Sequence, residues 1–354
     1  MTILIKYILS KYLKYFFIIL LSLELFFVGI DLLQNFKNLP NSANLQILYI
    51  LYTSFFSLTI VLPLSLIFGW VITLTFFIKN NEMVSFYSLG ISKRMILTPI
   101  LITMFLITTF LVILQSTPLA YSYEQKNKII HNNYFSNERD NIFLKYNNYF
   151  IYFGKLYPIQ KIAQDVHIFK IKNNDIVERI IAKKAYYQEN RWYIVDADIT
   201  YKPEVIDWDN SKIKTIHKDF LYTLEGFEPK IINNVYKSKP YYSTIDAIKT
   251  IILLENQDFN TNKVKVIFYS QLFKPYFTLP LAVLIFLLVG VSSRFFNNAK
   301  FISTSILLTL LIWGIMFLLE KFALGGIILA EVAIIIPLVA LVFVTYYFYL
   351  KRVD

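Results

Sequence analysis

Residues 55–78 read FFSLTIVLPLSLIFGWVITLTFFI, a stretch of 24 residues without a charged side chain. A helix needs about 20 consecutive apolar residues to cross the hydrocarbon core of a bilayer, so this stretch predicts a transmembrane helix. Five more runs predict further spanning helices. In chain order the six runs are Tyr15–Leu33, Phe55–Ile78, Met95–Leu114, Tyr276–Val291, Phe301–Leu319 and Ile327–Leu350.

The composition of the whole chain agrees with these runs. Of 354 residues, 56% are hydrophobic and only 17% are charged, which is too apolar for a water-soluble enzyme of this length. The first run follows three lysines but is long and lacks a small-residue cleavage site, so we interpret it as a retained anchor. The absence of cysteine from the sequence excludes disulfides, zinc thiolates and thiol nucleophiles.

The net charge of +11 is explained mainly by where the basic residues lie. The short loops on one side of the predicted spans offer only Lys37 and Lys321, whereas the other side carries ten basic residues against two acidic ones. The ten are Lys6, Lys11, Lys14, Lys79, Lys93, Arg94, Arg294, Lys300, Lys351 and Arg352. Because short cytoplasmic loops are enriched in Lys and Arg, both termini are predicted to be cytoplasmic. The distribution of the charge therefore indicates the orientation of the chain in the membrane. It removes the main argument for nucleic-acid binding.

The long polar segment between the third and fourth runs predicts a folded domain outside the cytoplasm. It is far longer than an ordinary loop, and its short alternating runs are separated by Asn-Asn, Asn-Asp and Asp-Asn turns. The predicted strands are Ile142–Tyr146, Tyr149–Phe153, Val166–Lys172, Ile176–Ile181, Arg191–Val195 and Ile213–Ile216. Strands at this spacing favour a β-sandwich or a jelly roll, and Leu119–Asn132 and Ser243–Asn256 predict helices on either side of it.

The sequence thus predicts an α-helical membrane protein with six transmembrane helices and an inserted all-β, jelly-roll-like domain. Residues 1–117 hold the first three helices, residues 118–263 hold the β domain with its flanking helices, and residues 264–354 hold the last three. The fourth helix is short as a purely apolar run, and the amphipathic Val264–Lys274 before it extends it toward an interface.

The sequence carries no recognisable enzymatic motif. His131, His167 and His217 are dispersed and form no HExxH-type pair, so solvated or core histidines are favoured over metal ligands. Neither GxSxG nor GxxxxGK[ST] occurs, which argues against an autonomous hydrolase or ATPase. Asp196 and Asp198 share one face of a predicted strand, and a solvated face is the favoured interpretation. We therefore expect no catalytic residue, metal or cofactor in this chain.

The loop after the second run is the most informative stretch, and residues 80–94 read NNEMVSFYSLGISKR. They predict a short helix over residues 80–92, with Asn81 as its cap, Glu82 in its first turn and Gly90 at its end. One face of this helix combines Met83, Phe86, Tyr87 and Gly90. An interfacial helix in the lipid headgroups and a docking helix that offers aromatic anchors to a cytoplasmic partner both fit this pattern.

This loop resembles the coupling helix of the LptF/LptG (YjgP/YjgQ) permease family, in which an acidic residue, a hydrophobic stretch and a small-Gly-hydrophobic-Ser/Thr pattern follow the second span. The order of three spans, a domain of this size and three more spans is also similar, so the resemblance covers essentially the whole chain. Asp31-Leu32-Leu33 resembles LptG rather than LptF. Further agreement lies in Leu62–Leu66 (LPLSL) and in Ser243–Asp258 followed by Tyr269, Phe273, Lys274 and Pro275.

The resemblance implies a permease subunit of an ABC transporter that extracts lipopolysaccharide from the bacterial inner membrane for outer membrane biogenesis. Family members pair as an LptF–LptG heterodimer and bind the ATPase LptB, which would hold ATP and Mg. They pass lipopolysaccharide to a periplasmic jelly-roll bridge that involves LptC and LptA. On this resemblance, coupling to the ATPase is expected at Asn81, Glu82, Met83, Phe86, Tyr87, Gly90 and Ile91.

A cavity for lipid A should be apolar, with basic residues at the level of the outer headgroups to bind the glucosamine phosphates. Lys37 is the first candidate and Lys321 the second, although ordinary interfacial snorkelling explains each equally well. Lys274, Glu24 and Asp31 are the other candidates for contact with the lipid. Glu24 lies within the first span and should face the interior, where we expect it to pair with Lys274. LptG relatives often place a Lys one turn before the position matched by Asp31, and the absence of that Lys here points to the partner subunit for phosphate recognition.

Two other classes of function stay open at this point. A membrane-anchored periplasmic sensor or scaffold without transport activity also fits a β domain carried on six spans. A membrane enzyme that acts on lipid is less well supported, because no clustered His, Asp or Ser motif lies at a membrane face. Copurification of an ATPase and of a related six-span subunit would separate a permease from a sensor.

Overall fold

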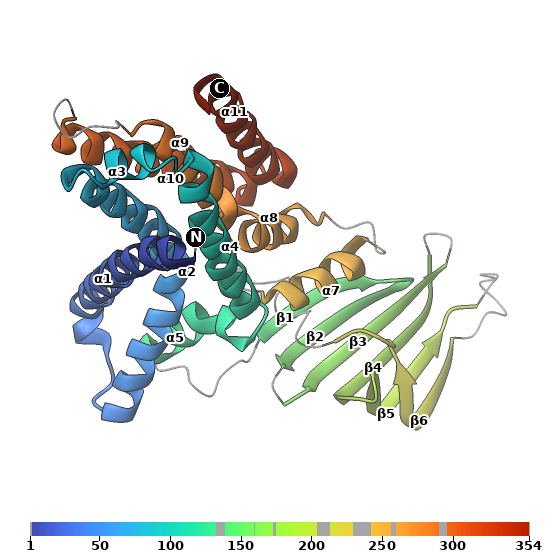
Figure 1. Cartoon of the computed structure of the whole chain (residues 1–354). Helices are drawn as coiled ribbons and strands as arrows, with labels where there is room; N and C mark the ends of the chain where they lie inside the picture. Colours follow the sequence, from blue (N-terminus) through green and yellow to red (C-terminus); the bar gives the residue numbers. More distant parts are fainter. Residues whose placement is uncertain are drawn as a thin grey trace. The chain divides into compact units, whose positions relative to one another are not determined.

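The computed structural model describes residues 2–131, 139–158, 160–172, 175–203, 213–228, 242–255, 260–289 and 296–353. The chain divides into two compact units, whose elements are labelled in Figure 1. The helical unit comprises Met1–Asn132, Tyr242–Ile251 and Asn260–Asp354, and the β unit comprises Asn133–Tyr241 and Ile252–Phe259.

Long apolar helices dominate the helical unit. Its described residues include five helices that are long and apolar enough to cross a membrane. These helices are α1 (Thr2–Asn35), α2 (Ala43–Lys79), α4 (Lys93–Gln115), α10 (Asn298–Leu324) and α11 (Ile336–Val353), the last entered through a π-helical turn, η5 (Glu331–Ile335). Helices suit these sequences because a helix satisfies its own backbone polar groups where lipid offers no hydrogen bonds.

A bent pair of helices passes the same length and hydropathy test when its two parts are taken together. Helix α8 (Asn262–Leu272) is followed by the 3-10 turn η3 (Lys274–Phe277) and by α9 (Thr278–Leu287), and the two parts are bent by 46°. Pro275 stands in the turn and has no backbone N–H to donate, which accounts for the break. The described helices agree with the predicted helical membrane protein, with five long apolar helices and a sixth when the bent pair is counted as one span.

Shorter elements connect the spans of the helical unit. The 3-10 helix η1 (Phe36–Asn38) follows α1, α3 (Glu82–Ser88) follows α2, and η2 (Pro118–Tyr121) with α5 (Ser122–Ile130) follows α4. Helix α7 (Thr244–Glu255) follows the β strands in the sequence. Both predicted flanking helices are therefore present.

The core of the helical unit is built around α2. Trp70 is fully buried, and its indole N–H donates to the Ala282 carbonyl of α9 at 3.2 Å. On the other side of α2, the buried Tyr12 hydroxyl of α1 donates to the Leu66 carbonyl at 3.3 Å. A buried indole or phenol needs such a partner, so these two bonds fix the position of α2 between its neighbours.

The β unit contains one antiparallel sheet of six described strands. They are β1 (Arg139–Tyr146), β2 (Tyr149–Tyr157), β3 (Ile162–Lys172), β4 (Asp175–Gln188), β5 (Arg191–Tyr201) and β6 (Lys214–Thr223). The first five predicted runs fall on β1 to β5, and Ile213–Ile216 overlaps the start of β6, which begins at Lys214. Two tight turns use residues with positive φ, Asn147 between β1 and β2 and the pair Glu189-Asn190 between β4 and β5, as two-residue hairpins require.

The pairing of the strands could not be predicted from hydrophobic periodicity in the sequence. Each described strand pairs with its neighbours in the sequence, in the order β1 to β6, which is a meander. A jelly roll instead combines two Greek keys. Strand spacing indicates how many strands there are, whereas their pairing depends on which turns are tight, and here short connections join β1 to β5 while a longer one leads to β6.

A row of unpaired positions crosses the whole sheet. The ladder skips Asn141, Gly154, Asp165, Lys183, Asp196 and Asp219, one in each strand. Asn141, Asp165 and Asp196 have φ between 52° and 58°. Left-handed residues interrupt a ladder and bend the strand, so the sheet bends along this row.

Candidate functional site

Helix α3 is a separate short helix with a defined start and end. Asn81 stands at its N-cap position with a φ of 56°, so the chain turns sharply between α2 and α3. Gly90 has a φ of 74°, and the N–H groups of Gly90 and Ile91 donate to the Tyr87 and Phe86 carbonyls, each at 3.0 Å. This is the Schellman arrangement, which favours glycine at the left-handed position. The helix therefore begins after Asn81 and ends before Gly90, although the Asn81 side chain makes no capping hydrogen bond.

The apolar face of α3 points into the chain itself. Met83 is 1% and Phe86 8% exposed, and the Phe86 ring packs edge-on against Phe77 of α2 with 5.6 Å between centroids. Tyr87 and Ile91 are half-buried against the same core. The expectation that Phe86 anchors a partner is therefore wrong. Periodicity identifies an apolar face, but it does not show whether that face contacts the same chain or a partner protein.

The opposite face of α3 is available to a partner. Val84 is 39% and Leu89 77% exposed, and Ser85 and Ser88 between them are exposed as well. An exposed large apolar side chain such as Leu89 beside small polar residues is typical of a surface that another protein covers. We call Val84, Ser85, Ser88 and Leu89 the outer face of α3.

Glu82 at the start of α3 is bound to the first span. The Tyr7 hydroxyl of α1 lies 2.9 and 3.0 Å from the two carboxylate oxygens of Glu82. The Tyr7 ring stacks on Phe77 at 6.3 Å, and the Lys11 ammonium lies 5.5 Å from its centroid. The predicted coupling residue Glu82 thus connects α3 to α1.

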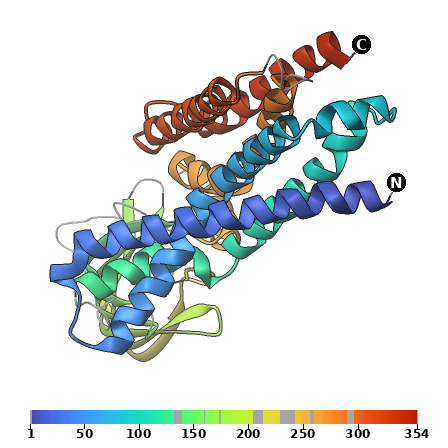
Figure 2. The same cartoon turned by 60° about the vertical axis from the view of Figure 1, so that its left-hand side comes forward.

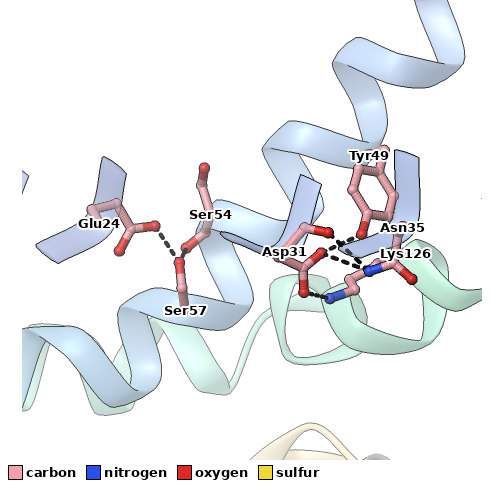
Figure 3. Close-up of polar contacts among 7 residues, drawn as sticks. All are labelled: Glu24, Asp31, Asn35, Tyr49, Ser54, Ser57 and Lys126. Atoms are coloured by element: carbon pink, nitrogen blue, oxygen red, sulfur yellow. Dashed lines mark hydrogen bonds and ion pairs between the residues drawn. The ribbon is translucent and has the colours of Figure 1, made fainter. Parts of the chain in front are cut away.

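Asp31 near the end of α1 accepts hydrogen bonds from three elements, as Figure 3 shows. The Lys126 ammonium of α5 pairs with Oδ2 and the Tyr49 hydroxyl of α2 donates to Oδ1. Asn35 of α1 donates to the Asp31 carbonyl at 2.9 Å and reaches Oδ1 at 3.4 Å. We call these four residues the Asp31 cluster.

Lys126 is the functional candidate that sequence reasoning missed. It is 5% exposed, and its ammonium lies 5.6 to 5.9 Å from the ring centroids of Tyr49, Phe56 and Tyr123. A lysine this deeply buried requires an anionic partner, which Asp31 provides. The sequence pattern does indicate this burial, because Lys126 shares the buried face of α5 with Ser122 and Ile129 at helical spacing.

Glu24 does not pair with Lys274 as expected. Its Oε1 accepts from the Ser57 hydroxyl of α2, while Oε2 is buried without a hydrogen-bond partner among the described residues (Figure 3). Lys274 instead pairs with Glu320 of α10 at 2.6 Å. The predicted Glu24–Lys274 pair is wrong because the sequence places charges in spans without showing which spans are neighbours.

The two remaining basic candidates lie at helix ends. Lys37 is exposed in η1, directly after α1. Lys321 is exposed in the last turn of α10, with its ammonium 4.9 Å from the Phe317 centroid. Lys274 lies 5.7 Å from the same ring, but Glu320 already neutralises it. Of these three lysines, Lys37 and Lys321 are the better placed to bind an anion.

The β unit brings His217 together with three carboxylates. Asp198 lies 2.9 Å from Nδ1, and Asp196 and Asp219 lie 3.2 and 3.9 Å from Nε2. The hydrogen bond to Asp198, followed by the charges of all three carboxylates, raises the pKa of His217. All four groups are exposed, which agrees with the predicted solvated face.

The comparisons with known proteins bear on the whole chain. A protein-family model described as lipopolysaccharide export system permease LptF/LptG matches residues 6–351. The chain belongs to the LptF/LptG family. No match was found among curated proteins.

Membership of the LptF/LptG family confirms the resemblance read from the sequence. The family is the lipopolysaccharide export permease, so this chain is a transporter component and not an enzyme. The five to six apolar helices and the β sheet agree with that assignment. The matched model describes LptF and LptG together, and the preference for LptG stays a prediction.

Proposed function

We propose that this chain is one permease subunit of an ATP-driven machine that extracts lipopolysaccharide from the inner membrane and passes it to a periplasmic jelly-roll bridge. The family match over residues 6–351 carries the proposal. The expected partners are an LptB-like ATPase that binds ATP and Mg, a paralogous permease of the same family, and LptC- and LptA-like proteins of the bridge.

The orientation follows from the charges. The flanks with ten basic residues are assigned to the cytoplasm, together with both termini and α3. The β unit is then periplasmic, on the side where lipopolysaccharide leaves the membrane. This orientation places the proposed ATPase contact and the proposed transfer domain on opposite sides of the bilayer.

The outer face of α3 is the proposed contact with the ATPase. Its inner face is held by Met83 and Phe86 in the core of the chain, and Glu82 is bound to Tyr7. A helix held in this way passes a displacement to the spans it packs on. Coupling also requires that the ATPase contact the outer face differently in its two nucleotide states, because a ligand shifts an equilibrium only by its differential affinity.

Lys37 and Lys321 are the proposed contacts for the lipid phosphates. Both are exposed at helix ends that the orientation assigns to the periplasmic side. A basic side chain at this level attracts an anionic headgroup by about 1 kcal/mol. Glu24 and Asp31 are acidic and already hydrogen-bonded to Ser57 and Lys126, so direct phosphate contacts are assigned to the two lysines.

The decisive experiment is reconstitution of the chain into proteoliposomes with the ATPase, the paralogous permease and the bridge proteins. We expect lipopolysaccharide to be released to the bridge only when ATP and Mg are supplied. Vesicles without this chain and vesicles that contain only phospholipid are the controls. Release at the same rate without ATP, or failure of the ATPase and the second permease to copurify, would instead support the sensor or scaffold alternative.

A further inference from the structure

Helix α1 is anchored at its start to the proposed ATPase-coupling helix. Tyr7 donates to Glu82 of α3, and its ring stacks on Phe77 at 6.3 Å. A hydrogen bond to a carboxylate is about twice as strong as one between neutral groups, and it depends on direction. Movement of α3 relative to the bilayer therefore acts on the first turns of α1.

The same helix is anchored at its other end to α5. Asp31 pairs with the buried Lys126, whose ammonium is surrounded by three aromatic rings. Helix α5 ends at Ile130 and is the last described helix before β1 begins at Arg139. In addition, Tyr121 of η2 donates to Asp246 of α7, which ties the chain segments that precede and follow the strands. Burial and this hydrogen bond raise the pKa of Tyr121 well above its usual value, so its hydroxyl stays protonated as the donor.

The helix between these anchors is continuous. Tyr7 and Asp31 are 24 residues apart in one α-helix, which is about 36 Å at 1.5 Å per residue. Figure 2 shows α1 along its length, with the N-terminus at one end. Backbone hydrogen bonds run along a helix axis, so an α-helix transmits an axial displacement with little change in length. Between the two anchors α1 is also bound to α2, through the Tyr12–Leu66 and Ser57–Glu24 hydrogen bonds, so a displacement of α1 along its axis carries α2 with it.

From these contacts we propose that α1 transmits the movement of α3 across the membrane to α5 and so to the connection that enters the β unit. Tyr7 and the Asp31–Lys126 pair are the positioning residues of this transmission. The proposal rests on the proposed function, and it adds a route by which ATP hydrolysis acts on the β unit. An alternative route leads through α2, which is covalently joined to α3 and contacts it through the Phe77 and Phe86 rings, and the variants below distinguish the two routes.

The test compares Tyr7→Phe, Lys126→Met and the double variant in the reconstituted complex. The measured quantity is the number of lipopolysaccharide molecules released per ATP hydrolysed. Tyr7→Phe keeps the ring stack and removes only the donor hydroxyl. Tyr15→Phe is the matched control, because Tyr15 lies on the same helix, packs on Phe76 at 5.9 Å, and its hydroxyl makes no hydrogen bond within the described part of the chain.

We expect each single variant to lower release per ATP about threefold to tenfold, while the ATPase still copurifies at normal stoichiometry. Because either substitution interrupts the same route and the remaining release then depends on other contacts, the double variant should release no less lipopolysaccharide per ATP than the more impaired single variant. Losses that multiply in the double variant would overturn the proposal, since they would indicate two independent structural roles. If Lys126→Met lowers release per ATP but Tyr7→Phe does not, the movement passes through α2, and the proposed transmission through α1 is overturned as well.

Two further measurements keep the result interpretable. If Lys126→Met does not fold, Tyr49→Phe removes one donor to Asp31 without exposing a buried charge, and the same pattern is expected from it. Thermal unfolding of each variant shows whether stability rather than coupling has changed. Absence of ATP-dependent release in the unaltered complex would refute the proposed function, whereas normal release per ATP in every variant would refute only the transmission through α1.

Discussion

Gly69 of α2 lies against the backbone of Phe16 in α1, so closely that a Cβ at position 69 would come within 2.9 Å of the Phe16 Cα. A backbone neighbour cannot rotate away as a side chain can. The two helices would have to separate, and α1 would lose packing along its length. Among the described glycines of the helical unit, Gly69 has the nearest neighbour at the position of an added Cβ.

Gly69→Ala is therefore expected to lower the free energy of unfolding by about 1 to 3 kcal/mol, which is the usual cost of overpacking a core. Unfolding in detergent or bicelles measures the change. Gly314→Ala in α10 is the matched control, because nothing lies within 4 Å of its added Cβ. In a helix that substitution is expected to stabilise by about 0.5 to 1 kcal/mol. Equal effects of the two substitutions would show that α1 and α2 do not pack this closely.

The Asp31–Lys126 pair is expected to behave as a buried ion pair. Lys126→Met leaves Asp31 without its cation, and loss of one partner of a buried pair costs about 3 to 5 kcal/mol. The double variant Asp31→Asn with Lys126→Met removes both charges and should recover part of that loss. A double-mutant cycle on unfolding free energies gives the coupling, and additive losses would contradict a direct interaction.

The two faces of α3 are expected to respond differently to substitution. Phe86→Ala deletes a buried ring and should cost about 3 to 5 kcal/mol of stability. Leu89→Asp alters only the outer face, so it should leave unfolding unchanged and reduce copurification of the ATPase at least tenfold. Normal copurification of Leu89→Asp would move the proposed contact away from this face.

The stability of the β unit is expected to depend on the charge of His217. Its pKa is raised in the folded chain by Asp198 first and then by Asp196 and Asp219, relative to the ordinary value of 6.5. Folding therefore favours the protonated ring. The resulting stabilisation is complete below pH 6.5 and is lost as the pH rises through the higher pKa of the folded state.

Histidine NMR of the labelled chain measures this pKa directly. Asp198→Asn should shift the titration of His217 to lower pH, and His217→Gln should remove its contribution to the pH dependence of unfolding. His131→Gln serves as the control, because His131 lies outside the carboxylate cluster. An identical His217 titration with and without Asp198 would contradict the geometry.

The features that follow from composition and period were predictable from the sequence. Charge-free runs such as Phe55–Ile78 have no stable alternative to spanning a membrane, and alternating runs such as Tyr149–Phe153 lie on strands. Gly90 was recognisable as a helix end because only its conformational freedom suits the left-handed turn there. These are local properties, and local sequence determines them.

The predictions that failed concern which surfaces meet. The apolar face of α3 was visible in the sequence, but its contact with Phe77 of α2 depends on the packing of the spans. Likewise Glu24 and Lys274 are the kind of residues that pair, yet each found a partner on the helix beside it, Ser57 and Glu320. Burial of Lys126 was not foreseen because an isolated lysine is usually solvated.

Every strand pair of the described sheet joins neighbours in the sequence, and this order has a consequence for biosynthesis. Contacts between nearby residues form fast, since little chain entropy is lost in closing short loops. The sheet can therefore assemble strand by strand during translation. It does not wait for α8 to α11, which are made last, so within the described sheet only β1 and β6 have an unpaired edge while the membrane part of the chain is still incomplete.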